Sequence, residues 1–178
     1  LAAAAKSGRG MALGGDRRSL RLGAQDEALI ARVAAVQPRT VVLVMAGSAV
    51  MVEPWIDSVA AVLHVWYPGM EGGAAIANVI TGAVNPSGRL PFAVPTDESH
   101  LPAFDPDASS VVYDRWHGQW LLDRNGHPPR YPFGFGLSYT SFALSDAAVA
   151  GDGVEYRVRC TVANTGERDG VEVVQVYG

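Results

Sequence analysis

The sequence predicts an α/β fold with a partial, parallel-rich sheet, followed by an all-β segment that is cut short. Two short apolar runs, residues 41–45 and 60–66, have the composition of strands buried on both faces of a parallel sheet. Segments with helical character lie on either side of them, at 26–36 and 74–80. Helices and apolar strands in this order imply right-handed βαβ crossovers.

Each element has its own local signals. The segment 26–36 opens with acidic residues and is stopped by Pro38, as expected of a helix. Residues 54–58, between the two strands, could form a short helix or a turn. The segment 74–80 has small and apolar residues that allow close packing on a sheet, and Gly82 is placed to end it. The apolar stripe of the first helix is expected to be Leu29, Ile30, Val33 and Val36.

The second half of the chain changes character twice. Residues 85–139 are rich in Pro, Gly and aromatic side chains without a period, which indicates a long connection that is functional or binds another domain. From residue 156, apolar and polar residues alternate as in a half-exposed strand, and 171–177 suggests a further strand. Two or three strands cannot make a sandwich, so we expect this domain to be incomplete.

Composition excludes several classes of protein. With 48% hydrophobic and 18% charged residues among 178, the chain can bury a core. The net charge of −4 and the scattered Lys and Arg do not favour a nucleic-acid partner. The longest apolar run, 41–52, is shorter than the roughly 20 residues of a membrane span. Cys160 is the only cysteine, and the four histidines lack metal-ligand spacing, so no metal or cofactor is expected. The compartment stays open between cytoplasm, periplasm and secretion.

Four short phrases occur in order along the chain. They are Gly-Asp-Arg at 15–17 with Ser-Leu-Arg-Leu at 19–22, Val-Trp-Tyr-Pro-Gly-Met-Glu-Gly-Gly at 65–73, Asn-Pro-Ser-Gly-Arg-Leu-Pro at 85–91, and Tyr-Pro-Phe-Gly-Phe-Gly-Leu-Ser-Tyr-Thr at 131–140. Each phrase alone is weak, but together they cover nearly the whole chain. In this combination the sequence resembles glycoside hydrolase family 3.

The resemblance implies a larger enzyme. Its first domain would be a (β/α)8-type barrel carrying an Asp nucleophile, and its second a three-layer α/β sandwich that often carries the acid/base. Many members add a fibronectin type III-like domain. Residues 1–95 would then be part of the sandwich, 96–141 a connection, and 142–178 a truncated fibronectin type III-like segment. The barrel would be a missing N-terminal partner, and we expect the chain to be truncated at Leu1.

The resemblance also puts the catalytic acid/base in question. Many relatives have Glu-Gly-x-Asp-Arg where this chain has Leu13, Gly14, Gly15, Asp16 and Arg17, so Leu13 stands at the position of the Glu. Leu cannot transfer a proton. Either the acid/base lies upstream of Leu1 in this subfamily, or it has been lost. Asp16 and Arg17 are candidates for contact with the sugar, and the alternative is a charged pair that fixes the loop.

Other candidate residues lie in the second half of the chain. Trp116 and Trp120 have aromatic faces suited to the C–H face of a pyranose, and His117 lies between them. For His117, a hydrogen-bonded loop histidine is the alternative. Glu71 precedes a predicted helix, where it could face a ligand, or accept backbone N–H bonds and complement the helix dipole. The aromatic rings of 131–140 could pack domains together or stack on sugar.

Three functional hypotheses follow. The first is a fragment of a retaining glycoside hydrolase acting on β-linked glucosides or xylosides, inactive alone because the barrel is absent. The second is a non-catalytic carbohydrate-binding or scaffold module, which the missing Glu would permit. The third is a structural fragment without a ligand.

Overall fold

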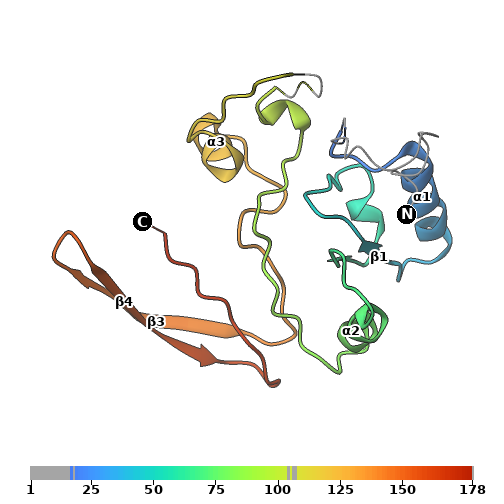
Figure 1. Ribbon diagram of the computed structural model, residues 1–178. Coiled ribbons are helices and arrows are strands. Elements are labelled where there is room, and N and C mark those ends of the chain that lie inside the picture. The colour runs from blue at the N-terminus through green and yellow to red at the C-terminus, as the bar shows by residue number, and fades with distance from the viewer. Residues whose placement is uncertain (1–16, 18, 104, 106–107, 178) are drawn as a thin grey trace. The chain divides into compact units, whose positions relative to one another are not determined.

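The computed structural model describes residues 17, 19–103, 105 and 108–177 (Figure 1). The described residues fall into two compact units. Unit 1 is drawn from 1–69 and 92–133, and unit 2 from 70–91 and 134–178. No helix in the described part of the chain is long and apolar enough to cross a membrane.

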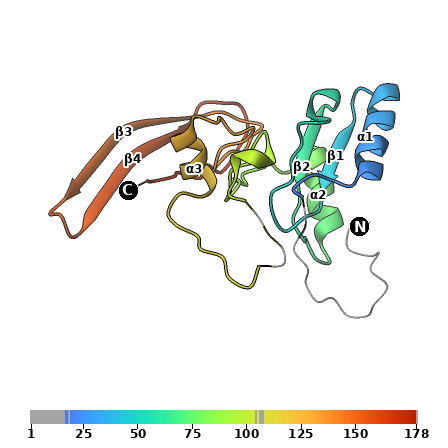
Figure 2. The ribbon, with the colours of Figure 1, turned by 90° about the horizontal axis from the view of Figure 1, so that it is seen from above.

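Unit 1 contains the predicted parallel strands. Helix α1 (Ala24–Val36) is followed by β1 (Val41–Val44), the 3-10 turn η1 (Ile56–Ser58) and β2 (Ala61–His64). Strands β1 and β2 pair in parallel, with Val41 opposite Ala61 and Val44 opposite His64 (Figure 2). The predicted helix, both strands, their parallel pairing and the short helix between them are therefore confirmed.

The core of unit 1 is small and lies on one side of β1. Its buried members are Val44, Val50, Val52 and Trp55, and the partly buried side chains packed against them include Ile30 of α1 and Tyr131. The predicted stripe of α1 is wrong in part. Ile30 and Ala34, four residues apart, turn inward, whereas Leu29, Val33 and Val36 are exposed. The inward face thus combines one large and one small side chain.

The long connection contains more regular structure than the sequence predicts. Within unit 1 it forms η2 (Glu98–His100) and helix α3 (Gly118–Asn125), and Leu122 of α3 is fully buried. A single bridge joins Val94 to Tyr131, where the Val94 amide donates to the Tyr131 carbonyl oxygen at 2.8 Å. Helix α3 escapes prediction because it spans only eight residues, too few to establish a hydrophobic period.

Unit 2 contains helix α2 (Gly72–Ile80) and an antiparallel ribbon of β3 (Phe142–Gly151) and β4 (Tyr156–Asn164), seen as the two long arrows in Figure 1. The predicted helix and the strand beginning at Tyr156 are confirmed. Pairing runs from Phe142 opposite Asn164 to Gly151 opposite Tyr156, with an irregularity between Ser145 and Ala148.

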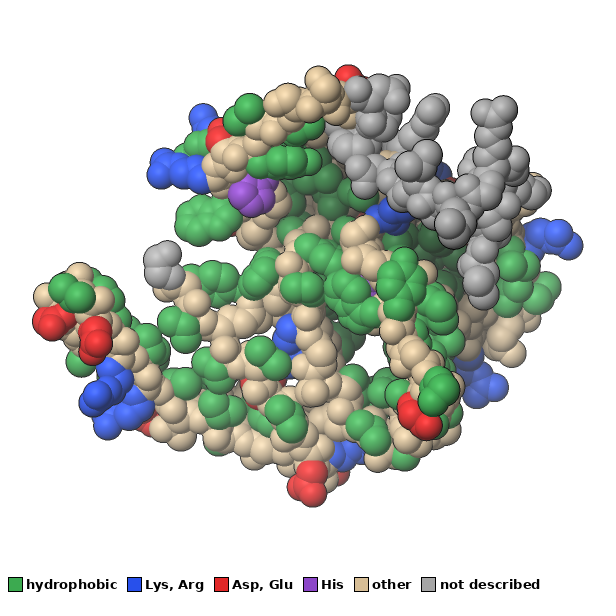
Figure 3. Space-filling view, viewed as in Figure 1, with side chains coloured by type: hydrophobic (Ala, Val, Ile, Leu, Met, Phe, Trp, Pro, Cys, Tyr) green, Lys and Arg blue, Asp and Glu red, His purple; other side chains and the backbone are tan. Residues whose placement is uncertain are grey.

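Two expectations for unit 2 are wrong. Residues 171–177 form no strand in the described structure, although their side chains are rich in valine. The alternation in β4 does not bury one face, because only Cys160 is partly buried along that strand. A strand requires a hydrogen-bonded neighbouring strand, and a buried face requires side chains packed against it. Among the described residues, 171–177 lack the first of these partners and β4 lacks the second. In Figure 3, hydrophobic side chains are spread over the visible surface.

Candidate functional site

The carboxyl ends of β1 and β2 lie at the same edge of their sheet because the two strands are parallel. Ligands of α/β proteins bind preferentially at this edge. After β1 come Ala46, Gly47 and Ser48, and after β2 come Trp66 and Tyr67. These two loops define the first candidate site.

Arg17 is tethered to the loop that follows β1. Its Nη2 atom donates to the carbonyl oxygen of Ala49 at 2.6 Å and also to Oγ of Ser48. The guanidinium of the Gly-Asp-Arg phrase is therefore held at the carboxyl end of the sheet. Asp16 and Leu13 lie outside the described residues, so the pairing of Asp16 with Arg17 stays a prediction.

His64 ends β2 and is partly buried. Its Nε2 atom lies 3.1 Å from the carbonyl oxygen of Ala46, and since a carbonyl only accepts, Nε2 carries the proton. Burial lowers the pKa of His64 below its ordinary value of 6.5, and the positive charge of Arg17 lowers it further, against the opposing effect of the Ala46 carbonyl. His64 is consequently a neutral hydrogen-bond donor near neutral pH.

Trp66 has an unusual backbone. Its φ of +53° lies in the left-handed region, which is rare for a bulky residue. The indole meets His64 at 4.5 Å and Phe92 at 5.5 Å between ring centroids, with interplanar angles of 74° and 60°. His64 and Phe92 also meet each other, at 5.7 Å. The three rings thus form one edge-to-face cluster, in which Trp66 keeps 36% of its surface exposed.

Tyr67 is more open than Trp66, at 74% exposed. Its ring lies against the backbone of Gly47, where a Cβ atom would come within 2.9 Å of Cε2 of the tyrosine. The absence of a side chain at residue 47 therefore leaves room for the Tyr67 ring. We call Arg17, His64, Trp66, Tyr67 and Phe92 the strand-end site.

The other predicted site residues gather at the start of α3. Trp116 has two guanidinium groups over its ring, those of Arg115 and Arg124, at 4.6 and 4.5 Å from the ring centroid. Nδ1 of His117 lies 2.6 Å from the carbonyl oxygen of Asp114, so His117 is a hydrogen-bonded loop histidine. Trp120 is 61% exposed. Within the described residues, no hydrogen bond or ring contact joins this group to Arg17.

Glu71 occupies the position before α2 that the sequence predicts, at the N-cap. Its side chain makes no capping hydrogen bond and is exposed. Because Glu71 does not cap the helix, its expected structural contribution is limited to the favourable position of its charge relative to the helix dipole.

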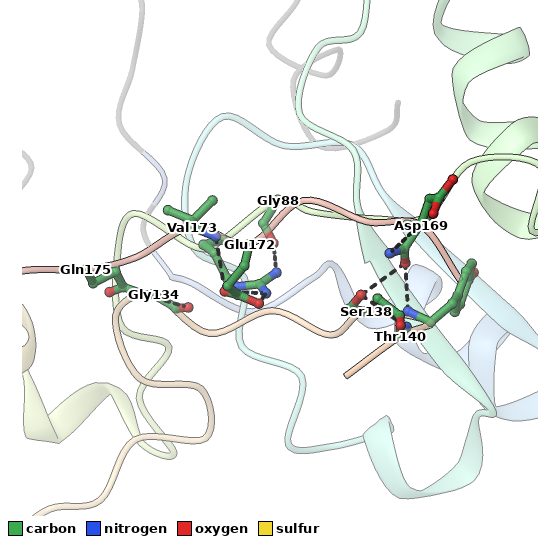
Figure 4. A network of polar contacts seen from close by, with 11 residues as sticks. Gly88, Gly134, Ser138, Thr140, Asp169, Glu172, Val173 and Gln175 are labelled. Atoms are coloured by element: carbon green, nitrogen blue, oxygen red, sulfur yellow. Dashed lines mark hydrogen bonds and ion pairs between the residues drawn. The ribbon is translucent and has the colours of Figure 1, made fainter. Parts of the chain in front are cut away.

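The second candidate site lies in unit 2, where two of the sequence phrases meet the last segment of the chain (Figure 4). Oδ1 of Asn85 accepts from Oγ of Ser138 at 3.1 Å and from the amide of Tyr139 at 2.7 Å. Nδ2 of Asn85 donates to the Asp169 carbonyl oxygen at 3.3 Å. Asn85 therefore joins three segments that are far apart in sequence.

A second connection in this junction is ionic. Nη2 of Arg89 donates to both carboxylate oxygens of Glu172, and Nε2 of Gln175 donates to the Gly134 carbonyl oxygen at 3.0 Å (Figure 4). A cavity of about 580 Å³ lies against these residues. Because Arg89 and Glu172 satisfy each other, the cavity offers no unpaired charge from this pair. The junction holds segments together, as expected for a motif with a structural role.

A parallel α/β layer together with an antiparallel β-ribbon places the chain among the mixed α/β proteins. The family model described as the glycosyl hydrolase family 3 C-terminal domain matches residues 2–139. The chain belongs to glycosyl hydrolase family 3, of which it carries the C-terminal domain.

Similarity to individual proteins and to solved structures supports this assignment. Beta-glucosidase B of Emericella nidulans is 41% identical, over 87% of this chain and 20% of its own. An exo-alpha-(1->6)-L-arabinopyranosidase of Bifidobacterium longum is 38% identical, over 92% of this chain and 22% of its own. Among solved structures, DesR, a beta-glucosidase of Streptomyces venezuelae in complex with D-glucose, matches with a TM-score of 0.77 and 38% identity. That match covers 86% of this chain and 21% of DesR. The chain spans about a fifth of the length of the curated relatives it matches.

Proposed function

We propose that the chain supplies part of the substrate-binding wall of a retaining glycoside hydrolase that acts on β-glucosides, with β-xylosides as the next candidate. The observation that carries this proposal is the strand-end site. Arg17, from one family phrase, is tethered at the sheet edge where Trp66 and Tyr67, from another, are exposed. Aromatic rings beside a guanidinium donor are suited to a sugar, which has both C–H faces and hydroxyl groups.

The chemistry of retention explains why the chain would need a further domain. Double displacement uses two carboxyl groups about 5–5.5 Å apart, one as nucleophile and one as acid/base. The strand-end site offers a guanidinium, a neutral imidazole, an indole and a phenol in the described residues, and none of these supplies the carboxylate pair. We therefore expect the nucleophile on the barrel, and the acid/base either upstream of Leu1 or lost with the change to Leu13.

The test compares the isolated chain with the full-length protein on p-nitrophenyl β-glucoside and β-xyloside. We expect no hydrolysis by the chain alone. The full-length protein should release β-glucose first, observed by NMR before mutarotation. A p-nitrophenyl α-L-arabinopyranoside belongs in the same panel, because one relative is named for that sugar. Turnover by the isolated chain, or an inverted first product, would refute the proposal.

A non-catalytic carbohydrate-binding or scaffold module is the second candidate function. Leu13 at the position of the Glu favours it, since a Leu there cannot protonate a leaving group. This alternative requires that the full-length protein bind sugar without turning it over. Saturation-transfer NMR with methyl β-glucopyranoside, beside the hydrolysis assay, separates the two functions.

A further inference from the structure

We propose that Trp66 and Tyr67 form a stacking surface for a pyranoside ring, with the guanidinium of Arg17 as its polar edge. This inference rests on the proposed function, and it assigns sugar contact to Trp66 and Tyr67, for which the sequence gives no such role. It also moves the stacking surface away from Trp116 and Trp120, the aromatic residues that composition favours.

The first argument is the backbone of Trp66. A left-handed φ of +53° is disfavoured for any residue with a Cβ, and such conformations gather at ligand-binding positions. Gly or Asn would adopt this backbone at a lower cost. The residue here is instead Trp, and its indole makes edge-to-face contacts with His64 and Phe92. A strained backbone that carries an immobilised but 36% exposed indole fits a preorganised contact surface.

The second argument is the neighbouring ring. Tyr67 is 74% exposed, yet its position is limited by the close approach of its ring to the Gly47 backbone. This contact on one side narrows the range of positions open to the phenol, which reduces the conformational entropy it would lose on contact with a ligand. Consecutive residues 66 and 67 thus present two aromatic side chains at the carboxyl end of β2, where ligands of α/β sheets bind.

The third argument is the state of Arg17. Both of its hydrogen bonds use Nη2, so among contacts between described residues Nη1 and Nε keep their N–H groups unused. Arg17 binds the carbonyl oxygen of Ala49 and His64 lies against that of Ala46, so both side chains reach the same loop after β1. An N–H group of Nη1 or of Nε can donate to a sugar hydroxyl group while the C–H face of the same sugar lies on the aromatic side chains.

The experiment uses the full-length glycosidase and p-nitrophenyl β-glucoside. Trp66→Gly removes the indole and suits the left-handed backbone, while Tyr67→Ala removes the phenol. We expect each to raise KM on the order of three- to tenfold, the size of one aromatic contact. Tyr156→Ala, which removes a phenol that is 68% exposed on β4, is the matched control and should leave KM unchanged.

Gly47→Ala provides an independent variant that keeps every aromatic side chain. Its Cβ would lie 2.9 Å from Cε2 of Tyr67, so the ring must move and KM should rise. Trp66→Tyr, in contrast, should have a KM close to that of the wild type. These two substitutions decide the question if Trp66→Gly fails to fold.

The outcomes separate this inference from the proposed function. If the wild type hydrolyses the glucoside and Trp66→Gly, Tyr67→Ala and Gly47→Ala all keep its KM, the stacking surface is refuted while the function stands. The same conclusion follows if Trp120→Ala alone raises KM. If the wild type does not hydrolyse the glucoside, the proposed function fails. Saturation transfer to methyl β-glucopyranoside then tests the surface directly, and it should be lost in Trp66→Gly and kept in Tyr156→Ala.

Discussion

The Nη2 atom of Arg89 lies 2.8 Å from each carboxylate oxygen of Glu172, across 83 residues of sequence. Only 11% of the arginine side chain and 16% of the glutamate side chain are exposed. Arg89 belongs to the Asn-Pro-Ser-Gly-Arg-Leu-Pro phrase, whereas Glu172 lies in a segment with no strand of its own. The ion pair therefore gives this phrase a role in fixing the end of unit 2.

Replacing Glu172 with Gln should lower the free energy of unfolding by about 1–3 kcal/mol, because the largely buried guanidinium loses its charged acceptor. Denaturant unfolding monitored by circular dichroism measures the change. Glu27→Gln is the matched control, since the guanidinium of its partner Arg21 is 50% exposed and solvent screens that pair. Equal losses in the two variants would contradict a special role for Arg89 and Glu172.

Gly136→Ala should also destabilise unit 2, by roughly 1–3 kcal/mol as for other overpacked positions. A Cβ at residue 136 would lie 2.2 Å from the backbone carbonyl oxygen of Gly88, which cannot rotate away. Gly88→Ala is the control from the same contact, because a Cβ at residue 88 meets nothing within 4 Å. Thermal unfolding of both variants tests this asymmetry, and a Gly136→Ala protein as stable as Gly88→Ala would disprove it.

His64 should make stability depend on pH. Burial lowers the pKa of His64 in the folded protein below the ordinary 6.5, so the unfolded chain takes up the proton first as pH falls. The contribution of His64 is therefore complete above about pH 6.5 and is lost below it. His64→Gln keeps a donor for the Ala46 carbonyl but cannot titrate. Unfolding temperatures between pH 5 and 8 should fall less steeply toward acid for this variant, and an unchanged slope would exclude His64 as the cause.

The valine pair Val149 and Val158 lies opposite on the β3–β4 ribbon, with 68% and 42% of each residue exposed. Changing both to Thr preserves β-branching while removing apolar surface. We expect the isolated chain to become more resistant to aggregation without a change in unfolding temperature. In the full-length protein, the same double substitution should lower the unfolding temperature if another part of the protein covers this face. Light scattering and calorimetry measure the two effects.

The elements that could be predicted from sequence are those with a sustained local pattern. Residues 41–45 and 60–66 are short apolar runs, and they form the paired strands β1 and β2. The stripe of α1 could not be predicted fully, because Leu29, Val33 and Val36 satisfy the helical period as well as Ile30 does. Which side of an amphipathic helix faces the core depends on neighbours that local periodicity does not specify. The valines of 171–177 failed as a strand for a similar reason, since a strand requires a partner.

The candidate site, like the fold, could be predicted from the sequence only in part. A sequence phrase predicts Arg17 as a candidate site residue. Its hydrogen bonds to Ser48 and Ala49 could not be predicted, because no local pattern indicates that these residues lie near Arg17. Trp66 was part of a recognised phrase, but its backbone conformation was not predictable from residue type, because left-handed φ is unexpected for Trp. The sequence does contain a useful signal, because residues 65–67 lie at the carboxyl end of a predicted parallel strand, where ligand-binding side chains often lie.

The contact between Gly47 and Tyr67 has an evolutionary consequence. A side chain at residue 47 would meet the ring at residue 67 unless that ring moved, so we expect substitutions at the two positions to be coupled. Homologous sequences with a larger residue at 47 should carry a smaller one at 67, as correlated substitutions in an alignment. For directed evolution of substrate preference, a library that randomises residue 67 alone would sample only the side-chain positions that are available beside Gly47. Randomising both positions together would reach ring placements that no single substitution can produce.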